Sequence, residues 1–578
     1  MPLSPRHPAR NRDRRARAPP TKAVAYPTRT AVLTRSSRSF LSSCRPAGHN
    51  LLSAGCNSTS GMGTSDSPAL DAPILRVSAG AGREDAEAVL DSARDAAETV
   101  AVANVGPVGI EELTPLVATT ADGTTAFHAN CTPQRARTLV ESLEDGTVVE
   151  EGAHAVVSHG EEQATFPVPD DGPLSVGRRD VLERCGWVDP TTAEGYEEFV
   201  AAEAGAAPET VISRVETVGL LGRGRGDARM DEPVAEEWRT ARETDGDPVV
   251  VVNAGETDDR NATDRTLLEA DPVAVLDGAT AVASAIGAED IVVYCPESAL
   301  GTRERVRKAM TAFNDTDAAE GVTIRTFAAP DMYIAAEPTM ALEALEGNDR
   351  LEARLRPPSP GEHGLYGRPT IVHTPRTFAQ VRRILRDPDA FDPDDADPGT
   401  RLLTVTGDVT APATLELPTG GSLETVLEAV SVDSEFKMAC VGGQFGGVTR
   451  SLDHTPSAPA LTGARLGTDG VVELFDQSRC AVVTAGTRAR FAEEENCGRC
   501  VPCREGSKQL TNLLRDIYSG EFKDDMLREL ARTMRETSIC YFGRSASRPV
   551  TTAMDEFEPE FHAHAEGRCP SGACEEVQ

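Results

Sequence analysis

The chain is poor in lysine, in aromatic residues and in long apolar segments. Only 5 of its 578 residues are Lys, 4% are aromatic and 2 are Trp. No apolar run approaches the roughly 20 residues that a membrane-spanning helix requires, so no membrane span is predicted. Thirteen Cys in a chain of this length exclude a small disulfide scaffold. We therefore expect a soluble protein of a reducing, cytoplasmic compartment.

Acidic residues far outnumber basic ones, with 92 Asp and Glu against 58 Lys and Arg and a net charge of −34. This balance excludes a nucleic-acid-binding protein, because such a protein needs a basic face. An acidic, lysine-poor surface is typical of halophilic proteins, which stay soluble in concentrated salt. A GC-rich genome, which favours Arg, Ala, Gly and Pro codons, explains the same bias, and the composition leaves both interpretations open.

The N-terminal segment differs from the rest of the chain. Residues 1–62 contain eleven basic residues and one acidic residue, Asp13, so this segment carries +10 and the remainder −44. An Arg- and Ser-rich, acid-poor segment resembles an organellar transit peptide. The abrupt change to acidic sequence favours a second interpretation, an over-extended start with translation beginning at Met62 or nearby. In both cases we expect no packed structure over residues 1–66.

The remaining length predicts roughly three or four domains. Over residues 70–165 the pattern predicts strands within 72–80, 100–106 and 124–131 and helices within 82–99 and 133–146, hence a small α/β unit. Over residues 175–388, four consecutive Val at 249–252 predict a strand buried on both faces. Helices at 264–286 and 301–314 alternate with further strands at 290–295 and 322–329. This βαβ alternation predicts a Rossmann-like parallel sheet covered by helices.

Two further units follow. Residues 398–480 predict a compact β-grasp module, with a hairpin, a helix capped near Ser422 and a further strand. Residues 485–565 predict helices. Ser507 is expected to cap the first, whose apolar stripe is Leu510, Leu513, Leu514 and Ile517; Gly520 ends it, and the second carries Met526, Leu527, Leu530 and Met534. An antiparallel pair of helices would return the chain to its starting point.

Four cysteines in this helical unit carry the strongest chemical signal. Cys497, Cys500 and Cys503 stand at C-x2-C-x2-C spacing in "NCGRCVPCREG", and Cys540 follows in "TSICYFGRSASRP". Three thiolates on one tight loop with a fourth, remote thiolate suit a 4Fe–4S cluster, which is held by four Cys thiolates. The alternative is structural zinc, although zinc sites usually pair two short hooks with two ligands each.

The other cysteines carry weaker signals. Seven are scattered singly and are interpreted as unpaired thiols, namely Cys44, Cys56, Cys131, Cys185, Cys295, Cys440 and Cys480. Cys569 and Cys574 stand in "RCPSGAC" within the last segment, residues 566–578. This segment is interpreted as a free tail, with a metal site as the alternative.

At these residues the chain resembles the NADH-binding flavoprotein subunit of respiratory complex I and its relatives in NAD(P)-linked hydrogenases and formate dehydrogenases. "CGRCVPCREG" and "SICYFGRSASRPV" are similar to that family's cluster motif. "LLGRGRG" and "VVVNAGE" resemble its FMN-binding loop and strand end, and "YIAAEPTMALEALEGNDRLEARLRPPSPGEHGLYGRPTIV" resembles its flavin and nucleotide pocket. "RLLTVTGDVTAP" resembles its β-grasp insert. The resemblance covers residues from about 70 to 578.

The resemblance implies a function and a site. NADH would give two electrons to FMN, which would pass them singly to the 4Fe–4S cluster and on to partner redox subunits, with NADPH as the alternative donor. The FMN and nucleotide residues would be Gly222, Arg223, Gly224, Gly226, Asn253, Glu256, Tyr333 and Glu337. Glu337 would face the nicotinamide as the catalytic residue. The protein would dock on other subunits, at most peripherally on a membrane complex.

The chain departs from the family pattern at the pocket. The family's glycine loop leads to a lysine that meets the FMN phosphate, whereas this chain has no Lys there and places Asp227, Asp231, Glu232, Glu236 and Glu237 nearby. Carboxylates repel phosphate, and Arg223, Arg225 or Arg229 would have to compensate. Gly255, Ala336, Pro338 and Thr374 replace further family residues. A second hypothesis therefore stays open: an iron–sulfur electron-transfer or scaffold subunit that has lost FMN and NADH.

The first α/β unit also resembles a known domain, the thioredoxin-like fold that carries a 2Fe–2S cluster in the hydrogenase relatives. Pro107 and Glu111 stand where that family has cysteines, and Cys131 is alone. We therefore expect a degenerate thioredoxin-like domain that binds no metal and docks a partner.

Overall fold

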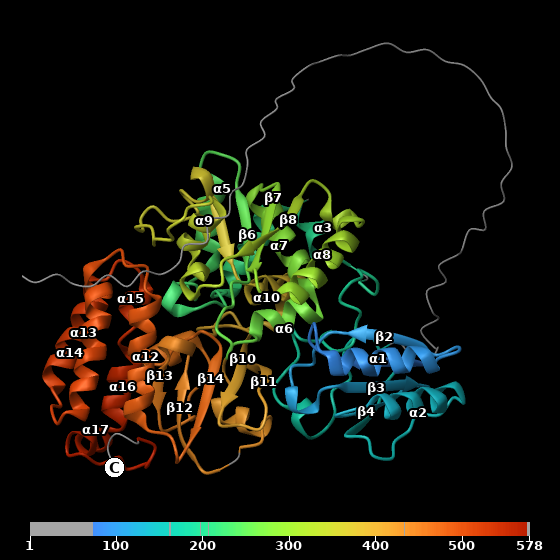
Figure 1. The fold of residues 1–578 in the computed structure, drawn as a ribbon. Coiled ribbons are helices and arrows are strands. Elements are labelled where there is room, and N and C mark those ends of the chain that lie inside the picture. Colours follow the sequence, from blue (N-terminus) through green and yellow to red (C-terminus); the bar gives the residue numbers. More distant parts are fainter. Residues whose placement is uncertain (1–72, 161–162, 197, 206, 433, 575–578) are drawn as a thin grey trace, which may run out of the picture. The chain divides into compact units, whose positions relative to one another are not determined.

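The structure is a computed structural model, and it describes residues 73–160, 163–196, 198–205, 207–432 and 434–574 (Figure 1). The basic segment expected over residues 1–66 lies outside these ranges, so its interpretation stays a prediction. Within the described ranges, no helix is both long enough and apolar enough to cross a membrane. The described residues form three β-sheets and a C-terminal group of helices.

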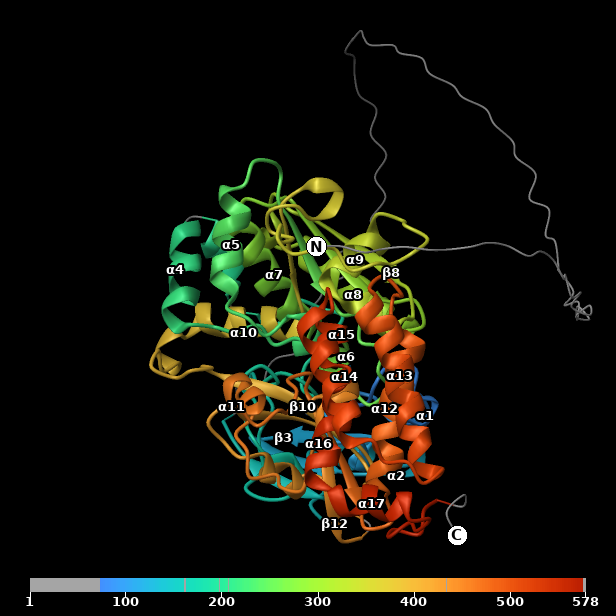
Figure 2. The same ribbon diagram turned by 90° about the vertical axis from the view of Figure 1, so that its left-hand side faces the viewer.

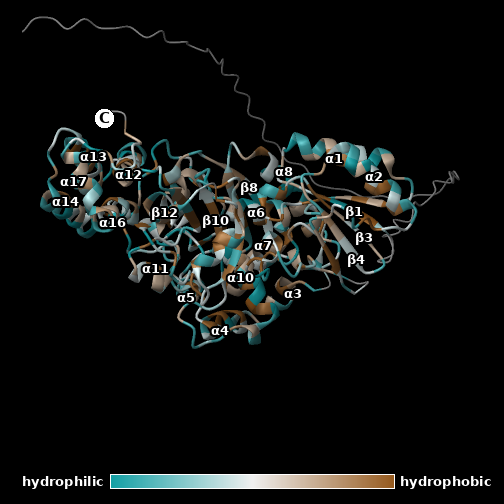
Figure 3. Cartoon of the chain, turned by 90° about the horizontal axis from the view of Figure 1, so that it is seen from below, coloured by the Kyte–Doolittle hydropathy of each residue, from teal (hydrophilic) through white to brown (hydrophobic). Residues whose placement is uncertain are grey.

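The N-terminal sheet has the order β2-β1-β3-β4-β5, with β1 and β2 parallel and the other pairs antiparallel. Its strands are β1 (Ile74–Ser78), β2 (Ala101–Val105), β3 (Leu116–Ala121), β4 (Thr124–His128) and β5 (Ala155–Ser158). Helices α1 (Glu84–Ala96) and α2 (Pro133–Glu144) contact each other on one face of the sheet (Figure 3). The predicted α/β unit is therefore present.

Strands β3 and β5 go beyond the prediction for this unit. The hairpin between β3 and β4 turns at Asp122 and Gly123, whose φ angles of 49° and 69° are both left-handed. An Asp-Gly pair is a strong signal for such a two-residue turn, so the sequence already held this information. Strand β5 has only four residues of alternating burial at the sheet edge, a pattern too short to stand out.

The second sheet is entirely parallel, with the order β8-β7-β6-β9. Its strands are β6 (Val249–Asn253), β7 (Asp290–Pro296), β8 (Thr323–Ala329) and β9 (Thr370–His373). Side chains of a strand alternate between the two faces of the sheet. Val250 and Val252 therefore join one apolar core, and Val249 and Val251 join another on the opposite face.

Different elements cover these two faces. On the Val250 face lie helices α3 (Val200–Ala204), α4 (Pro208–Val218), α5 (Val234–Glu243), α7 (Pro272–Ile286), α8 (Leu300–Asn314) and α10 (Pro375–Arg386). The Val249 face packs against residues 333–345, including α9 (Pro338–Leu345), and against apolar residues of the C-terminal helices. The cysteine-rich region therefore lies on the face of the sheet that α7 does not cover.

One helix of this domain differs from its prediction. The single stretch expected at 264–286 is two helices, α6 (Thr263–Ala270) and α7. Pro272 has no N–H to donate and favours the first turn of a new helix. The Asp271 side chain accepts a hydrogen bond from the Ala274 N–H and caps that helix.

The third sheet has the order β11-β10-β14-β12-β13. Its strands are β10 (Thr400–Gly407), β11 (Ala413–Pro418), β12 (Phe436–Val441), β13 (Gly447–Thr449) and β14 (Val471–Asp476), with the short helix α11 (Ala458–Gly463) beside them. The predicted hairpin is β10 and β11. The helix expected near Ser422 is a 3₁₀ segment (Leu423–Glu428), which the Ser422 side chain caps at the Glu424 N–H.

The C-terminal helices lie beside the third sheet (Figure 2), and they share an apolar core with β12, β13 and β14. They are α12 (Ala481–Glu495), α13 (Val501–Tyr518), α14 (Asp524–Thr537), α15 (Tyr541–Ser545), α16 (Arg548–Glu556) and α17 (Glu558–Ala565). The helix pair expected around Gly520 is α13 and α14. The expected cap is wrong: Ser507 lies inside α13 and donates to the Cys503 carbonyl, because α13 begins directly after Cys500.

The last described residues correct a second expectation. Residues 566–574 do not form a free tail, since Cys574 is only 6% exposed. Its side chain belongs to the same apolar core as Ile517 of α13 and Phe561 of α17.

Candidate functional site

The four predicted cluster cysteines come together at the N-termini of two helices. Cys500 directly precedes α13, Cys503 lies in its first turn and Cys540 directly precedes α15. Cys503 belongs to one apolar core, and Cys497, Cys500 and Cys540 pack against that core. The return of the chain through α14 therefore brings the remote cysteine to the three-cysteine loop.

The surroundings of these thiols suit an anionic metal cluster. Helix N-termini present unpaired N–H groups and a partial positive charge. A hydrogen bond from the Cys503 thiol lowers the pKa of Cys500 to about 5, and backbone N–H groups assist. Burial raises the pKa of Cys540 to about 12, so a buried thiolate there needs a neighbouring cation. Four Cys thiolates are the donor set of a 4Fe–4S cluster, and the residues present fit it.

Gly543 allows the two cysteine-bearing helices to meet. A Cβ atom at this position would lie 2.8 Å from the Cys503 Cβ and 2.6 Å from the Ser538 Oγ. Both distances are shorter than carbon and oxygen atoms tolerate without a shift of the chain. Only a glycine at residue 543 therefore lets α15 approach α13 this closely.

The glycine loop folds back on its own chain. The Gly222 N–H donates to the Glu232 carbonyl, and the Gly224 N–H donates to the Met230 carbonyl. A Cβ on Gly222 would lie 2.2 Å from the Met230 oxygen, so this close approach requires glycine. Gly226 also lies close to a side chain, since a Cβ there would lie 2.6 Å from the Thr468 Oγ1.

Two arginines of this loop are committed to internal contacts. The buried Arg223 pairs with Asp397 at 2.7 Å and donates to the carbonyls of Thr400 and Pro398, so it ties the loop to the β-grasp unit. The buried Arg225 pairs with Asp227 at 2.8 Å. Arg223 was expected at a phosphate, and the structure directs its guanidinium elsewhere.

Tyr333 joins the glycine loop to the cluster helices. The Arg225 guanidinium lies 3.6 Å from the centroid of its ring, and the Tyr333 hydroxyl donates to Asp227 at 3.0 Å. The same ring makes edge contacts with Phe491 of α12 and Phe542 of α15. This aromatic contact therefore connects the predicted pocket with the cysteine region.

Asn253 and Glu256, at the end of β6, also have partners inside the protein. The Asn253 amide donates to the Ala336 carbonyl at 2.8 Å and accepts from the Gly255 N–H. Glu256 accepts from the N–H of Asp264 and the hydroxyl of Thr263 at the start of α6. Both residues hold the strand end against its neighbours.

Glu337 stands between the pocket and the cysteines. Its carboxylate accepts from the Thr339 and Met340 N–H groups and so caps α9. It also pairs with Arg356 at 2.8 Å. Its charge acts on the nearby thiol of Cys540.

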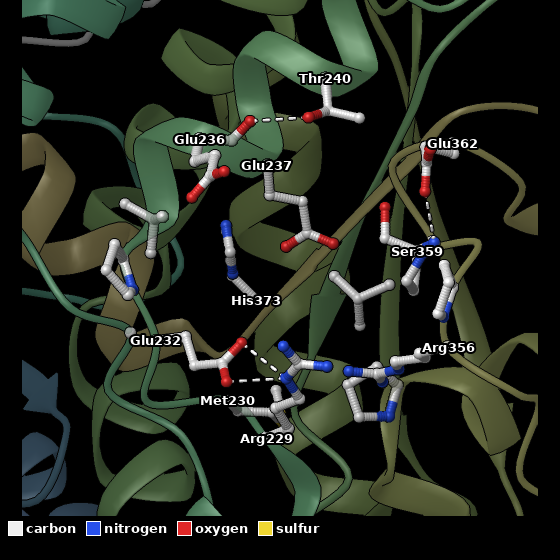
Figure 4. A pocket seen from close by; sticks show the side chains of 17 residues that line it. Arg229, Met230, Glu232, Glu236, Glu237, Thr240, Arg356, Ser359, Glu362 and His373 are labelled. Atoms are coloured by element: carbon white, nitrogen blue, oxygen red, sulfur yellow. Dashed lines mark hydrogen bonds and ion pairs between the residues drawn. The ribbon is translucent and has the colours of Figure 1, made fainter.

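A cavity of about 350 Å³ opens beside these residues (Figure 4). Its lining comes from Gly222 of the loop, from α5, from residues 356–362 and from the end of β9 at Val372 and His373. In the sheet, β7 and β8 lie on one side of β6 and β9 lies on the other. The cavity therefore borders the carboxyl end of β9, and parallel sheets bind ligands outside the carboxyl ends of their strands.

The charges of this cavity are mixed. Four glutamates line it (Glu232, Glu236, Glu237 and Glu362), and Arg229 and Arg356 are its two cations. Arg229 pairs with Glu232 at 2.7 Å. Burial raises the pKa of Glu237 to about 7. Burial lowers the pKa of His373 to about 4, so this ring is neutral and accepts from the Trp238 indole N–H.

The cavity fits a flavin nucleotide in size and offers two guanidinium groups for its phosphate, since small-molecule sites span roughly 300–1,000 Å³. Sequence reasoning named Arg229 as a compensating charge but missed Arg356 and His373. An arginine beside the "PPSP" segment was the available signal for Arg356. Thr374, which replaces an expected asparagine, caps α10 at the Thr377 N–H.

The N-terminal unit contributes to a second cavity, of about 900 Å³. Pro107 and Glu111 line it, together with residues after β6 and β7 and residues of the β-grasp unit. Glu111 pairs with Arg83 at 3.0 Å. Pro107 and Glu111 thus line a cavity that the N-terminal unit shares with the parallel-sheet unit and the β-grasp unit.

Comparisons with known proteins agree with this arrangement. Residues 215–383 match the family described as the Nuo51 FMN-binding domain, and residues 484–564 match the NADH-ubiquinone oxidoreductase-F iron–sulfur binding region. The F subunit of the NADH-quinone oxidoreductase of Streptomyces coelicolor is 32% identical over 402 residues, which are 65% of this chain and 88% of that protein. The HndC subunit of the NADP-reducing hydrogenase of Solidesulfovibrio fructosivorans is 28% identical over 68% of this chain and 85% of its own length.

Among solved structures, the NAD⁺-reducing [NiFe]-hydrogenase in the H₂-reduced state matches with a TM-score of 0.60 and 24% identity, over 85% of each chain. This likeness shows the fold. The sequence matches are stronger and carry the assignment. The chain therefore belongs to the family of the NADH-quinone oxidoreductase F subunits, and it carries that family's FMN-binding domain and iron–sulfur binding region.

Proposed function

We propose that this protein is the NADH-oxidising flavoprotein subunit of a complex I-like, dehydrogenase or hydrogenase assembly. FMN held in the cavity would supply the chemistry that couples hydride transfer from a nicotinamide to single-electron transfer to an iron–sulfur centre. Cys497, Cys500, Cys503 and Cys540 would hold the 4Fe–4S cluster. NADH is the proposed donor, and NADPH remains the alternative.

The continuous packing between pocket and cysteines supports this proposal most directly. Tyr333 and Met340, from the segment that borders the cavity, share one apolar core with Cys503, and Cys540 packs against it. Phe491 and Phe542 surround the Tyr333 ring. Apolar and aromatic side chains thus pack continuously from the cavity segment to the cysteines, an arrangement that suits electron transfer between the two sites.

The cavity side chains have distinct proposed roles. Arg356 and Arg229 would bind the phosphate of an anionic nucleotide, because both guanidiniums reach the cavity. Glu337, which the resemblance places beside the nicotinamide, holds Arg356 in position through their 2.8 Å ion pair. Gly222 leaves room for close approach of a ligand to the loop backbone. Neutral His373 adds no charge of its own.

One observation favours a second candidate, an iron–sulfur electron-transfer or scaffold subunit without flavin. The polar groups of Arg225, Asn253 and Glu256 all have protein partners, and no Lys lies in the glycine loop. A ligand that needs these groups must displace existing hydrogen bonds. The four cysteines would keep their role in this candidate.

The deciding experiment measures flavin and activity on the same preparation. The full chain is purified anaerobically, FMN is added, and bound flavin, iron and NADH-dependent reduction of ferricyanide are measured. Arg356→Gln should lower FMN affinity about tenfold to a hundredfold, because a hydrogen bond to a charged group contributes roughly 1.5–3 kcal/mol. Arg350→Gln is the matched control, since Arg350 is exposed and pairs with Glu352.

The outcomes separate the two candidates. Flavin binding and NADH oxidation that fall in Arg356→Gln but not in Arg350→Gln support the flavoprotein assignment. A protein with about four irons per chain that neither binds FMN nor oxidises NADH at any salt concentration is the iron–sulfur subunit instead.

The setting of the protein is also part of the proposal. The named relatives are subunits by their descriptions, and we expect partner redox subunits here too. The net charge of −34 with 53 Arg and 5 Lys supports a halophilic protein. We further propose that it is cytoplasmic and docks peripherally on its assembly. Activity that rises with salt concentration would support the halophilic assignment.

A further inference from the structure

A second group of metal-ligand residues lies away from the cluster cysteines. The Sγ atoms of Cys480, Cys569 and Cys574 and a ring nitrogen of His564 all lie within 4.8 Å of one another. The four residues come from three parts of the chain: the start of α12, the end of α17 and the segment that follows it. Neither the resemblance nor the family matches assign a role to this group.

The distances within the group suit one tetrahedral ion. The His564 Nε2 lies 3.3 Å from the Cys480 Sγ and 3.5 Å from the Cys574 Sγ. In a zinc tetrahedron with Zn–S of about 2.3 Å and Zn–N of about 2.0 Å, neighbouring S and N atoms stand about 3.5 Å apart. The ligand atoms thus already have the spacing of a coordination shell.

The histidine ring is oriented for metal binding. Its Nδ1 lies 2.7 Å from the backbone carbonyl of Glu560, one turn earlier in α17. A proton on Nδ1 that is donated to this carbonyl leaves the Nε2 lone pair facing the three sulfurs. Metal-binding histidines usually fix their tautomer through such a second hydrogen bond. The Tyr518 ring packs against the imidazole at 5.6 Å and limits its rotation.

The site is closed to solvent on most sides. Cys480, His564 and Cys574 are 3%, 1% and 6% exposed, and Cys569 is half-buried. Three thiols and one imidazole from separate parts of the chain thus converge on one point, where a single metal ion could contact all four. With four protein ligands no position is left for a substrate, which is the arrangement of structural rather than catalytic zinc.

This site is separate from the cluster. Cys480 directly precedes α12 and Cys497 follows it, and a helix of 15 residues is about 22 Å long. Figure 2 shows α17 at the opposite end of the helical unit from α15. The two expectations on these cysteines are corrected together: Cys480 is not an isolated thiol, and Cys574 does not lie in a free tail.

We propose that Cys480, His564, Cys569 and Cys574 bind one zinc ion. The ion ties the junction between β14 and α12 to the end of α17 and to residues 566–574. It thereby stabilises the far end of the helix whose other end leads to the cluster loop. The rival state is a disulfide between Cys569 and Cys574.

The test measures zinc and iron together on the full chain, purified anaerobically under reducing conditions. We expect about one zinc per chain in addition to about four cluster irons. Cys569→Ser should lose the zinc and keep the iron, because Cys569 is the most exposed ligand and its replacement perturbs packing least. Cys540→Ala should lose the cluster iron and keep the zinc.

Cys440→Ser is the matched control. Cys440 is a buried thiol of the same apolar core, and its Sγ contacts the Gly443 carbonyl rather than a metal-ligand group. Zinc that persists in this variant and disappears in Cys569→Ser ties the metal to the proposed ligands. A chelator should also remove zinc from the unmodified chain and increase hydrogen exchange over residues 558–574, and added zinc should restore protection.

The proposal is overturned by unmodified protein that contains cluster iron but neither holds nor takes up zinc. It is equally overturned by zinc content that is unchanged in Cys569→Ser, or by thiol alkylation that finds Cys569 and Cys574 joined in a disulfide. If Cys569→Ser does not fold, zinc chelation and hydrogen exchange on the unmodified chain decide whether zinc is bound at this site. The NADH activity enters none of these outcomes.

Discussion

The guanidinium of Arg225 lies 3.6 Å from the centroid of the Tyr333 ring. Through this contact the glycine loop, which belongs to the nucleotide side of the protein, is held against the aromatic residues of the cluster helices. Asp227 completes the arrangement, since it pairs with Arg225 and accepts from the Tyr333 hydroxyl. The two functional regions therefore share one buried polar network.

Arg225→Gln should destabilise the protein strongly. The change leaves the buried Asp227 carboxylate without its cation, and removing one member of a buried ion pair costs roughly 3–5 kcal/mol. The double variant Arg225→Gln with Asp227→Asn should recover much of this loss, because no uncompensated charge remains. Chemical unfolding of the three proteins measures the effect, and equal stability of the single and double variants would contradict it.

Cys540→Ala should remove the 4Fe–4S cluster. One of four thiolate ligands is lost, so the reduced protein should lose its paramagnetic resonance signal and most of its iron. Cys131→Ala, which changes a buried thiol of the N-terminal unit, is the control and should keep both. One zinc and no iron at the four cysteines in anaerobically prepared protein would show that the zinc alternative is right.

Gly543→Ala should weaken cluster binding. The added methyl group meets Cys503 and Ser538 at 2.8 Å and 2.6 Å, and overpacking of this kind costs roughly 1–3 kcal/mol. Gly486→Ala is the control, because its added Cβ meets no atom within 4 Å and alanine favours a helix by about 1 kcal/mol. Iron content after reconstitution and the thermal unfolding midpoint measure both variants; an unchanged midpoint in Gly543→Ala would refute the steric argument.

Flavin affinity should rise with salt concentration. The cavity holds four glutamates and two arginines, and salt screens their repulsion of a phosphate, since the Debye length falls from about 10 Å at 0.1 M to about 3 Å at 1 M. Glu236→Gln should raise affinity at low salt and flatten the dependence. Glu243→Gln changes a residue on the same helix but outside the cavity, and it should leave both the flavin affinity and its salt dependence unchanged. Quenching of flavin fluorescence measures both, and affinity that falls with salt would argue against repulsion.

Flavin affinity should also depend on pH through Glu237, whose pKa is raised by burial to about 7. Below that value the carboxyl group is neutral, and above it the carboxylate repels an anionic ligand. Binding should therefore weaken as the pH rises from about 6 to about 8, and by linkage the bound phosphate raises this pKa further. In Glu237→Gln the slope over this interval should disappear; a slope that persists would assign the titration to another group.

Short-range patterns were sufficient for much of the fold. Four consecutive Val predicted β6, and the C-x2-C-x2-C spacing with a helical return predicted which cysteines meet. These signals are local, or depend on one antiparallel helix pair. The helix break at Asp271 and Pro272 and the turn at Asp122 and Gly123 were equally local, so the sequence held them although the prediction did not use them.

The family resemblance, the parallel sheet and the four cluster cysteines could be predicted from the sequence, because each rests on the order and spacing of residues along the chain. The contacts of Cys480 with His564, 84 residues apart, and of Arg225 with Tyr333, 108 residues apart, became visible only in the folded chain. Such contacts depend on how helices and sheets pack together. Which side chains meet at such a separation along the sequence depends on how whole helices and sheets bury their surfaces against one another. No local sequence pattern encodes this packing.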